Sequence, residues 1–308
     1  MIIGGGPAGY TAGIYAARAG LKTLLIEGET TVSQITITDL IENYPGIPDG
    51  INGFELVHLF RQQAEKFGLE ILQGDVASFV KDHSNGKETW KIKEADVDYL
   101  TYAVIIATGA SWRKVGIPGE ENFAGRGVSY CATCDGPFYR NKEVTVIGGG
   151  DTAIQEAIFL THFAQRVTVI HRRNRLRAAK ILQKRAFANS KIKFIWDSVV
   201  DEITGDELVN GVKIRNLQTE ALMDLPADGV FIFAGVDPNT QILHGVVDLD
   251  KNGYIVADSN MHTSAEGIFA CGDCINKLLR QVVTACGDGA TAAFSAQLYV
   301  EALKGETY

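Results

Sequence analysis

The chain carries the same strand–turn–helix–strand pattern twice. Each copy begins with a short apolar run, residues 2–3 and 144–147, and continues through a glycine-rich turn into a helical stretch. The turns are Gly-Gly-Gly-Pro-Ala-Gly at 4–9 and Gly-Gly-Gly-Asp-Thr-Ala at 148–153, both of the form G-x-G-x-x-[G/A]. Glycines permit a tight turn and close backbone approach to a pyrophosphate, and the N-terminus of the following helix holds that anion. The pattern predicts two α/β units that each bind a dinucleotide.

The residue that ends the second strand differs in charge between the two copies. Glu27 lies 23 positions after Gly4, and His171 lies 23 positions after Gly148. A carboxylate there accepts hydrogen bonds from ribose hydroxyls and repels a 2′-phosphate, which suits FAD or NAD. His171 opens the basic run His-Arg-Arg-Asn-Arg-Leu-Arg at 171–177, whose guanidinium groups match the 2′-phosphate of NADP. A solvated basic face is the alternative for this run, but its position at a strand tip favours the phosphate site.

Hydrophobic periodicity and turn residues place the remaining elements of an α/β fold. Residues 54–67 have the spacing of an amphipathic helix, and the alanine-rich stretch 279–303 is typical of a closing helix. Residues 191–217 alternate as the antiparallel strands of a smaller sheet layer would. Further helices are expected at 10–19 and 154–163, and strands at 23–26, 90–93, 102–107, 167–170, 229–234 and 267–270.

Composition narrows the class of protein. The chain has 308 residues, of which 46% are hydrophobic and 21% charged, and this balance suits two globular domains. Its formal net charge of −8 argues against a nucleic-acid or membrane-surface binder, which needs a basic face. No apolar run approaches the roughly 18 residues of a membrane helix, and no signal-peptide pattern opens the sequence. Five cysteines, an odd number, favour a reducing cytoplasm in which any disulfide is catalytic.

Two cysteines separated by two residues precede the second glycine turn. Cys131 and Cys134 can close a small, reducible disulfide, and such motifs lower the pKa of the attacking thiol. Asp135 follows directly and is a candidate to exchange a proton with them. A structural thiol pair and half of a zinc site are the alternatives. The second C-x-x-C, at 271–274, is too far along the chain for usual structural zinc spacing, so redox chemistry is favoured and no metal is expected.

These motifs, in this order, resemble those of the low-molecular-weight thioredoxin reductases, and the resemblance spans essentially the whole chain. The two glycine turns and the basic run form part of it. The other matching segments are Glu-Asn-Tyr-Pro-Gly at 42–46, Ala-Thr-Gly at 107–109, Cys-Ala-Thr-Cys-Asp-Gly at 131–136, Gly-Asp at 272–273 and Arg-Gln at 280–281.

The resemblance implies two Rossmann-like domains in a three-layer arrangement with small antiparallel sheets. An FAD-binding domain, residues 1–113 and 243–308, is interrupted by an NADPH-binding domain at 114–242 that carries the redox disulfide. The family also implies a homodimer with thioredoxin as its protein substrate. Rotation of the inserted domain is expected about linkers near 115–119 and 235–239.

The resemblance also assigns roles to residues. Electrons pass from NADPH through FAD and the Cys131–Cys134 disulfide to the disulfide of thioredoxin. Cys134 is then the sulfur nearest the flavin, Cys131 attacks the partner, and Asp135 exchanges the proton. The implied FAD-binding residues are Gly4, Gly6, Pro7, Ala8, Gly9, Glu27, Gln34, Asn43, Thr108, Gly109, Gly272, Asp273, Arg280, Gln281 and Val282. The implied NADPH-binding residues are Gly148, Gly149, Gly150, Asp151, Thr152, Ala153, His171, Arg172, Arg173 and Arg177.

The sequence departs from the family pattern in the first strand and in one loop. Only Ile2 and Ile3 precede the first glycine turn, although this strand should be central in its sheet. The usual Gly-Gly-Gln of the early FAD loop reads Val-Ser-Gln at 32–34, and Trp112 stands where tyrosine is common. None of these three changes removes a catalytic group.

Two other functions remain open at this stage. A related flavoprotein that serves a peroxidase-linked or glutaredoxin-like partner would share the C-x-x-C and both turns. A ferredoxin-fed relative would have no need of the basic run at 171–177. A non-catalytic flavoprotein that senses the NADP pool belongs to a different class and predicts that the thiols are dispensable.

Overall fold

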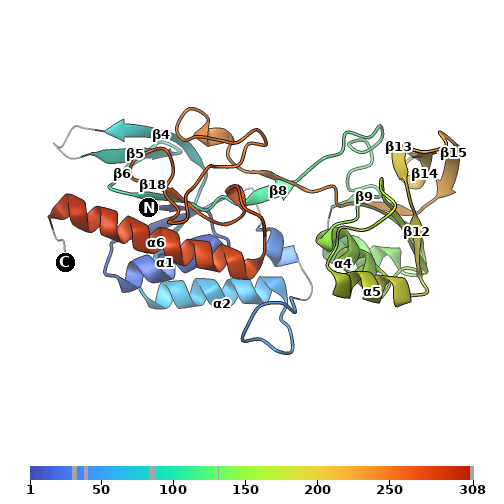
Figure 1. Ribbon diagram of the computed structural model, residues 1–308, viewed down its shortest axis with the longest axis horizontal. Coiled ribbons are helices and arrows are strands. Elements are labelled where there is room, and N and C mark those ends of the chain that lie inside the picture. Colours follow the sequence, from blue (N-terminus) through green and yellow to red (C-terminus); the bar gives the residue numbers. More distant parts are fainter. Residues whose placement is uncertain (30–32, 38–40, 83–87, 131, 306–308) are drawn as a thin grey trace. The chain divides into compact units, whose positions relative to one another are not determined.

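The chain folds into two compact units, one of which is inserted in the other. Unit 1 comprises residues 1–111 and 237–308, and unit 2 comprises residues 112–236. At the crossing, β8 (Ala110–Trp112) pairs with β17 (Val236–Pro238). The computed structural model describes residues 1–29, 33–37, 41–82, 88–130 and 132–305 (Figure 1).

Unit 1 is built on a five-stranded parallel sheet with the strand order β18-β7-β1-β2-β3. The two-residue β1 (Ile2–Ile3) is central, as predicted, because it pairs with β2 (Leu24–Glu27) on one side and β7 (Val104–Ile106) on the other. The outer strands are β3 (Glu70–Gln73) and β18 (Ile268–Ala270). This order brings the start of the chain and its last quarter into one sheet.

Helices cover one face of this sheet and a second sheet covers the other (Figure 1). Side chains alternate between the faces of a strand, so Ile2 packs in the core beneath the helices while Ile3 packs toward the antiparallel sheet. The helices are α1 (Pro7–Arg18), α2 (Gly53–Lys66) and α6 (Val282–Lys304), and the antiparallel sheet contains β4 (Val76–Asp82), β5 (Thr89–Glu94) and β6 (Val97–Thr101).

Unit 2 repeats the plan with its own parallel sheet, in the order β12-β11-β10-β16-β9. Its strands are β9 (Val128–Ser129), β10 (Glu143–Ile147), β11 (Arg166–Ile170), β12 (Ile192–Ile195) and β16 (Gly229–Ile232). The unit also contains the helices α4 (Asp151–Leu160) and α5 (Lys180–Ala188). A separate antiparallel sheet consists of β13 (Ser198–Gly205), β14 (Val209–Asn216) and β15 (Leu222–Pro226). The short elements of unit 2 are α3 (Ala132–Asp135) and the 3-10 turn η2 (Gly136–Tyr139). Unit 1 contains the 3-10 turns η1 (Gln34–Ile37), η3 (Gln241–Leu243) and η4 (Gly272–Cys274).

Two predicted elements differ from the structure. The expected antiparallel run 191–217 begins with β12, which instead pairs parallel with β11. Alternation does not distinguish the two cases, because Ile192 and Phe194 pack on the helix side and Ile195 on the other. The closing helix begins at Val282 instead of residue 279, because Gln281 and Thr284 form a capping box that fixes its first turn.

The described residues contain neither a membrane-spanning helix nor a cluster of metal ligands. None of the helices in the described ranges combines the length and hydropathy that a bilayer span requires. Across the same ranges, no group of three or more His, Cys, Asp or Glu side chains is arranged to hold a metal ion.

A buried carboxylate holds the first segment of unit 2. Glu120 is only 1% exposed, and its Oε2 accepts hydrogen bonds from the backbone N–H groups of Gly116 at 2.7 Å and Ile117 at 3.1 Å. Val115 N–H contributes a third bond, and the Tyr130 hydroxyl donates to Oε1 at 2.6 Å. The segment that we expected to be a linker near 115–119 is therefore fastened within unit 2.

We expect Glu120→Gln to destabilise the protein by about 1–3 kcal/mol, because the amide nitrogen cannot accept the bonds that the lost oxygen accepted. Burial opposes ionisation of Glu120, but the bonds from Tyr130 and the backbone outweigh it and lower the pKa. A lowered folded-state pKa gives stability that is present above the unfolded pKa and lost as pH falls through the folded pKa. Urea unfolding at neutral and acid pH measures the free energy of unfolding of the unchanged protein and of the variant. The difference between the two should shrink in acid.

The matched control is Glu121→Gln. Glu121 is the next residue, but its side chain is 79% exposed and makes a surface ion pair with Lys114. Such pairs contribute little to the free energy of unfolding. Equal destabilisation by the two substitutions would contradict the role of Glu120.

Candidate functional site

The first glycine turn of unit 1 is packed too closely to accept side chains. Gly4 has φ +118°, and a Cβ built there would lie 2.2 Å from the carbonyl oxygen of Ala107. A Cβ at Gly9 would lie 1.8 Å from the carbonyl oxygen of Gly4. Helix α1 begins at once with Pro7, and no side chain caps it. The turn therefore presents backbone N–H groups at a helix N-terminus, the arrangement that binds a pyrophosphate.

Two segments far away in the sequence close around this turn. A Cβ at Gly272, in η4, would come within 2.9 Å of the Ala8 Cβ, so η4 packs on the start of α1. Thr108 follows β7, and its hydroxyl donates to the Asn239 carbonyl at 2.7 Å. The Asn239 amide donates in return to the Thr108 carbonyl at 3.0 Å. Asn239 was not among the predicted site residues, and no local pattern marks it.

Asp273 supplies an unsatisfied acceptor in unit 1. Its Oδ1 is buried and has no hydrogen-bond partner among the described residues. Burial raises the pKa of Asp273, while the nearby cations of Lys277 and Arg280 act in the opposite direction. An unmatched buried acceptor costs about 1–3 kcal/mol, a cost that a donor from a bound molecule removes. The residues here fit a ligand hydroxyl, such as those of a flavin ribityl chain.

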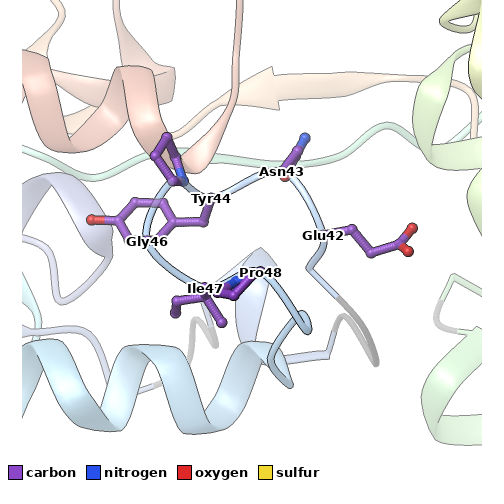
Figure 2. A pocket seen from close by; sticks show the side chains of 7 residues that line it. Glu42, Asn43, Tyr44, Gly46, Ile47 and Pro48 are labelled. Atoms are coloured by element: carbon purple, nitrogen blue, oxygen red, sulfur yellow. The ribbon is translucent and has the colours of Figure 1, made fainter.

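The loop at 42–48 joins two predicted site residues that lie far apart in the sequence. The Asn43 side-chain amide donates to Gln281 Oε1 at 2.8 Å, directly before α6. Tyr44 packs edge-on against Phe60 of α2, with ring centroids 5.7 Å apart. Figure 2 shows this loop around the pocket that its own residues line. Gln34 lies elsewhere in unit 1, where its amide donates to the Ala110 carbonyl at 2.6 Å.

Arg280 and its neighbours connect η4 to α6. The Arg280 guanidinium donates to the carbonyl oxygens of Asp273 at 3.4 Å and Ile275 at 3.2 Å, and it lies over the Tyr254 ring. Most of the residues predicted for FAD thus occur on segments linked by hydrogen bonds or close packing within unit 1. Their contacts with FAD stay predictions.

The second glycine turn, in unit 2, has the same close packing. Gly148 has φ +146°, and a Cβ there would lie 2.5 Å from the Phe233 carbonyl oxygen. A Cβ at Gly149 would lie 2.5 Å from the His171 ring, so this ring rests on the turn. The basic loop folds back over the turn, since Arg177 N–H donates to the Gly149 carbonyl at 2.8 Å.

Acidic and small residues complete the start of α4. Asp151 is its first residue, and Asp151 Oδ1 accepts a 2.6 Å hydrogen bond from the backbone N–H of Ala179. Thr152 and Ala153 follow on the helix, and Ala153 is buried in the core of unit 2. The predicted Asp151 therefore anchors the end of the basic loop as well as the first turn of the helix.

His171 supplies one of two unsatisfied buried side-chain atoms in the described part of unit 2, and the other is Thr145 Oγ1, inside β10. His171 is 6% exposed, and its Nε2 is buried with no hydrogen-bond partner in the described part of the chain. Burial, followed by the charges of Arg177 and Arg173, lowers the pKa of His171. Arg172 and Arg173 are exposed beside it. A buried ring nitrogen next to exposed guanidinium groups fits a phosphorylated ribose.

The predicted redox motif lies only partly within the described residues. Cys131 falls outside them, and the backbone of Cys134 belongs to α3. Ala132 is fully buried in the core of unit 2, which fixes α3 beside the second sheet. Asp135 ends the helix near Tyr139, whose pKa rises to about 12 because of burial and the nearby carboxylate charge.

The second C-x-x-C has a different environment. Cys271 and Cys274 are fully buried free thiols, and they belong to different cores of unit 1. Cys271 packs with the helices, whereas Cys274 packs with the antiparallel sheet. Burial raises the pKa of Cys271 and raises that of Cys274 to about 11. Protonated, buried thiols are poor nucleophiles, so the pair acts as two small apolar residues.

We expect neither Cys271 nor Cys274 to react with iodoacetamide in the folded protein at neutral pH, because burial keeps both thiols protonated and inaccessible. Peptide mapping by mass spectrometry measures the labelling of each cysteine, with urea-unfolded protein as the control. Labelling of either residue in the folded protein at the rate found after unfolding would contradict this assignment.

Comparisons with known proteins agree over both units. The model of the pyridine nucleotide-disulphide oxidoreductase family matches residues 1–289. A thioredoxin reductase of Streptomyces coelicolor is 46% identical, over 99% of this chain and 95% of its own length. One of Listeria monocytogenes is 47% identical, over 99% and 94%. A crystal structure of Lactococcus lactis thioredoxin reductase has a TM-score of 0.93 and 46% identity, covering 97% of each chain.

Proposed function

We propose that this chain, which belongs to the pyridine nucleotide-disulphide oxidoreductase family, is a thioredoxin reductase that uses NADPH to reduce the disulfide of thioredoxin. One observation carries the proposal: in the two equivalent glycine turns, the side chains that pack on the middle glycine belong to segments of opposite charge. Glu27 lies on Gly5 in unit 1, and His171 with its following arginines lies on Gly149 in unit 2. This pair of sites suits two different dinucleotides, of which only the one bound by unit 2 carries a 2′-phosphate.

FAD is assigned to unit 1 and NADPH to unit 2. Asp273 Oδ1, without a donor among the described residues, would accept from a flavin hydroxyl, and the turn at Gly4 to Gly9 would hold the pyrophosphate. His171 Nε2, Arg172 and Arg173 would hold the 2′-phosphate of NADPH. When bound, the two cofactors supply a two-electron path from nicotinamide to the protein disulfide.

The thiol chemistry belongs to the chain itself. The Cys131 thiolate attacks one sulfur of the thioredoxin disulfide, forming a mixed disulfide while the other thioredoxin sulfur leaves as a thiolate. The Cys134 thiolate then attacks Cys131 Sγ, which closes the Cys131–Cys134 disulfide and frees the second thioredoxin sulfur. Two electrons pass to thioredoxin and two protons complete its thiols. Asp135 is the residue proposed to exchange one of these protons with Cys134.

The proposal extends to a homodimer in the cytoplasm. Phe294 and Leu298 lie one turn apart on α6 and are 57% and 50% exposed, an apolar strip that a second copy would cover. Cys271, Cys274 and Cys286 are free thiols, which suits a reducing compartment.

We expect Cys134→Ser to separate flavin reduction from substrate reduction. The holoprotein should be yellow, bleached by NADPH and restored by oxidised thioredoxin, as followed by flavin absorbance. The Cys134→Ser variant should still be bleached but not restored, because the disulfide that transfers the electrons cannot form. Cys286→Ser is the control and should behave as the unchanged protein.

Two other results would redirect the proposal. Bleaching without restoration in the unchanged protein would indicate a different disulfide partner. Unimpaired reduction of thioredoxin by the Cys134→Ser variant would exclude the proposed thiol chemistry.

We expect Arg172→Ala and Arg173→Ala to raise the KM for NADPH while KM for NADH stays almost unchanged. Each charge-assisted phosphate contact contributes about 1.5–3 kcal/mol, so each substitution should raise the KM about tenfold or more. Arg166→Ala is the matched control, since Arg166 is exposed at the opposite end of β11 and pairs with Glu143. Steady-state kinetics with both nucleotides measures the preference, and an unchanged preference would refute the phosphate site.

A further inference from the structure

An arginine of α2 reaches the acidic residue that ends β2. Arg61 Nη1 donates to Glu27 Oε2 at 3.0 Å, and Arg61 Nε donates to Glu65 Oε1, also at 3.0 Å. Glu65 lies one turn further along the same helix. The guanidinium therefore bridges two carboxylates, one at the glycine turn and one on the helix surface. The Glu27 side chain is 17% exposed and the Arg61 side chain 42%, so the carboxylate end of this bond is the more shielded from water.

The two oxygens of Glu27 have different surroundings. Oε2 is the oxygen bound to Arg61. Oε1 would lie 3.0 Å from a Cβ placed on Gly5, so it is close to the glycine turn. No described residue donates a hydrogen bond to Oε1, and a carboxylate oxygen beside a dinucleotide turn is suited to accept one from a ribose hydroxyl. One oxygen is thus used for orientation and the other is left for a ligand.

The charge of Arg61 favours an ionised Glu27, and the charge of Glu65 opposes it. Burial raises the pKa of Glu27, and the Arg61 charge opposes this effect and favours the carboxylate form. One arginine with two glutamates still leaves this cluster with a formal charge of −1. That balance disfavours a 2′-phosphate, in contrast to the basic loop of unit 2.

We propose that Arg61 is a positioning residue for the adenosine ribose of FAD, acting by holding one oxygen of Glu27 so that the other accepts from a ribose hydroxyl. The inference rests on the proposed function, which assigns FAD to unit 1. Arg61 does not touch the flavin in this scheme. Its contribution is the fixed direction and ionised state of the Glu27 carboxylate.

The test measures retention of FAD, not turnover. Holoprotein purified with excess FAD is diluted, and released flavin is followed by its fluorescence to give a Kd. Loss of one charge-assisted orienting bond should raise the Kd about tenfold in Arg61→Gln. Arg61→Lys keeps the positive charge but not the forked guanidinium, so its Kd for FAD should lie between those of the unchanged protein and Arg61→Gln. Glu65→Gln is the matched control, because it removes the other partner of Arg61 and should leave the Kd within about twofold.

A double substitution identifies how Arg61 acts. If it acts only through Glu27, the Kd of Glu27→Gln/Arg61→Gln should equal that of Glu27→Gln alone. If the fold-changes in Kd of the two single variants multiply in the double variant, the proposal is overturned, because Arg61 would then act on FAD binding independently of Glu27. An unchanged Kd in Arg61→Gln, or a lowered Tm with an unchanged Kd, would overturn it as well. Unchanged protein that binds no FAD would refute the proposed function itself, a result distinct from these.

Discussion

The structure depends on backbone packed against backbone at two glycine turns. At Gly4 the carbonyl of Ala107 occupies the space that any side chain would need, and at Gly148 the carbonyl of Phe233 does the same. Each contact joins the loop after the central strand of a sheet to the loop after a neighbouring strand. Because the loops touch, the N-terminus of the following helix faces the carboxyl ends of the strands, where open α/β sheets bind their ligands.

The two glycine turns share this close packing but differ in the side chain that lies against the middle glycine. Glu27 lies on Gly5 and carries one arginine partner, whereas His171 lies on Gly149 within a loop of arginines. Each turn also has a polar atom that nothing in the described chain satisfies: Asp273 Oδ1 in unit 1 and His171 Nε2 in unit 2. Buried polar atoms without partners are rare in native proteins, so both indicate places where a ligand completes the bonding.

Local pattern was enough to predict the repeated units and the glycine turns, because each depends on residues close together in the sequence. It was not enough for partners supplied by remote segments. Asn239 binds Thr108 across 131 positions, and Arg61 binds Glu27 across 34, with no periodicity to mark either. Alternation also assigned β12 to the wrong sheet, because this edge strand of the parallel sheet starts with a buried and then an exposed residue, as an antiparallel strand would.

Two cysteine pairs with equal spacing show what decides redox function. Cys271 and Cys274 have the spacing but pack into separate cores, where burial raises the pKa of both thiols. Spacing alone is therefore not sufficient for such chemistry. The chain leading to Cys131 is held differently: Tyr130 donates to Glu120, and Glu120 also binds the backbone at Gly116. The segment that enters unit 2 and the segment that precedes its redox motif thus share one buried carboxylate, so displacement of either strains a common set of hydrogen bonds.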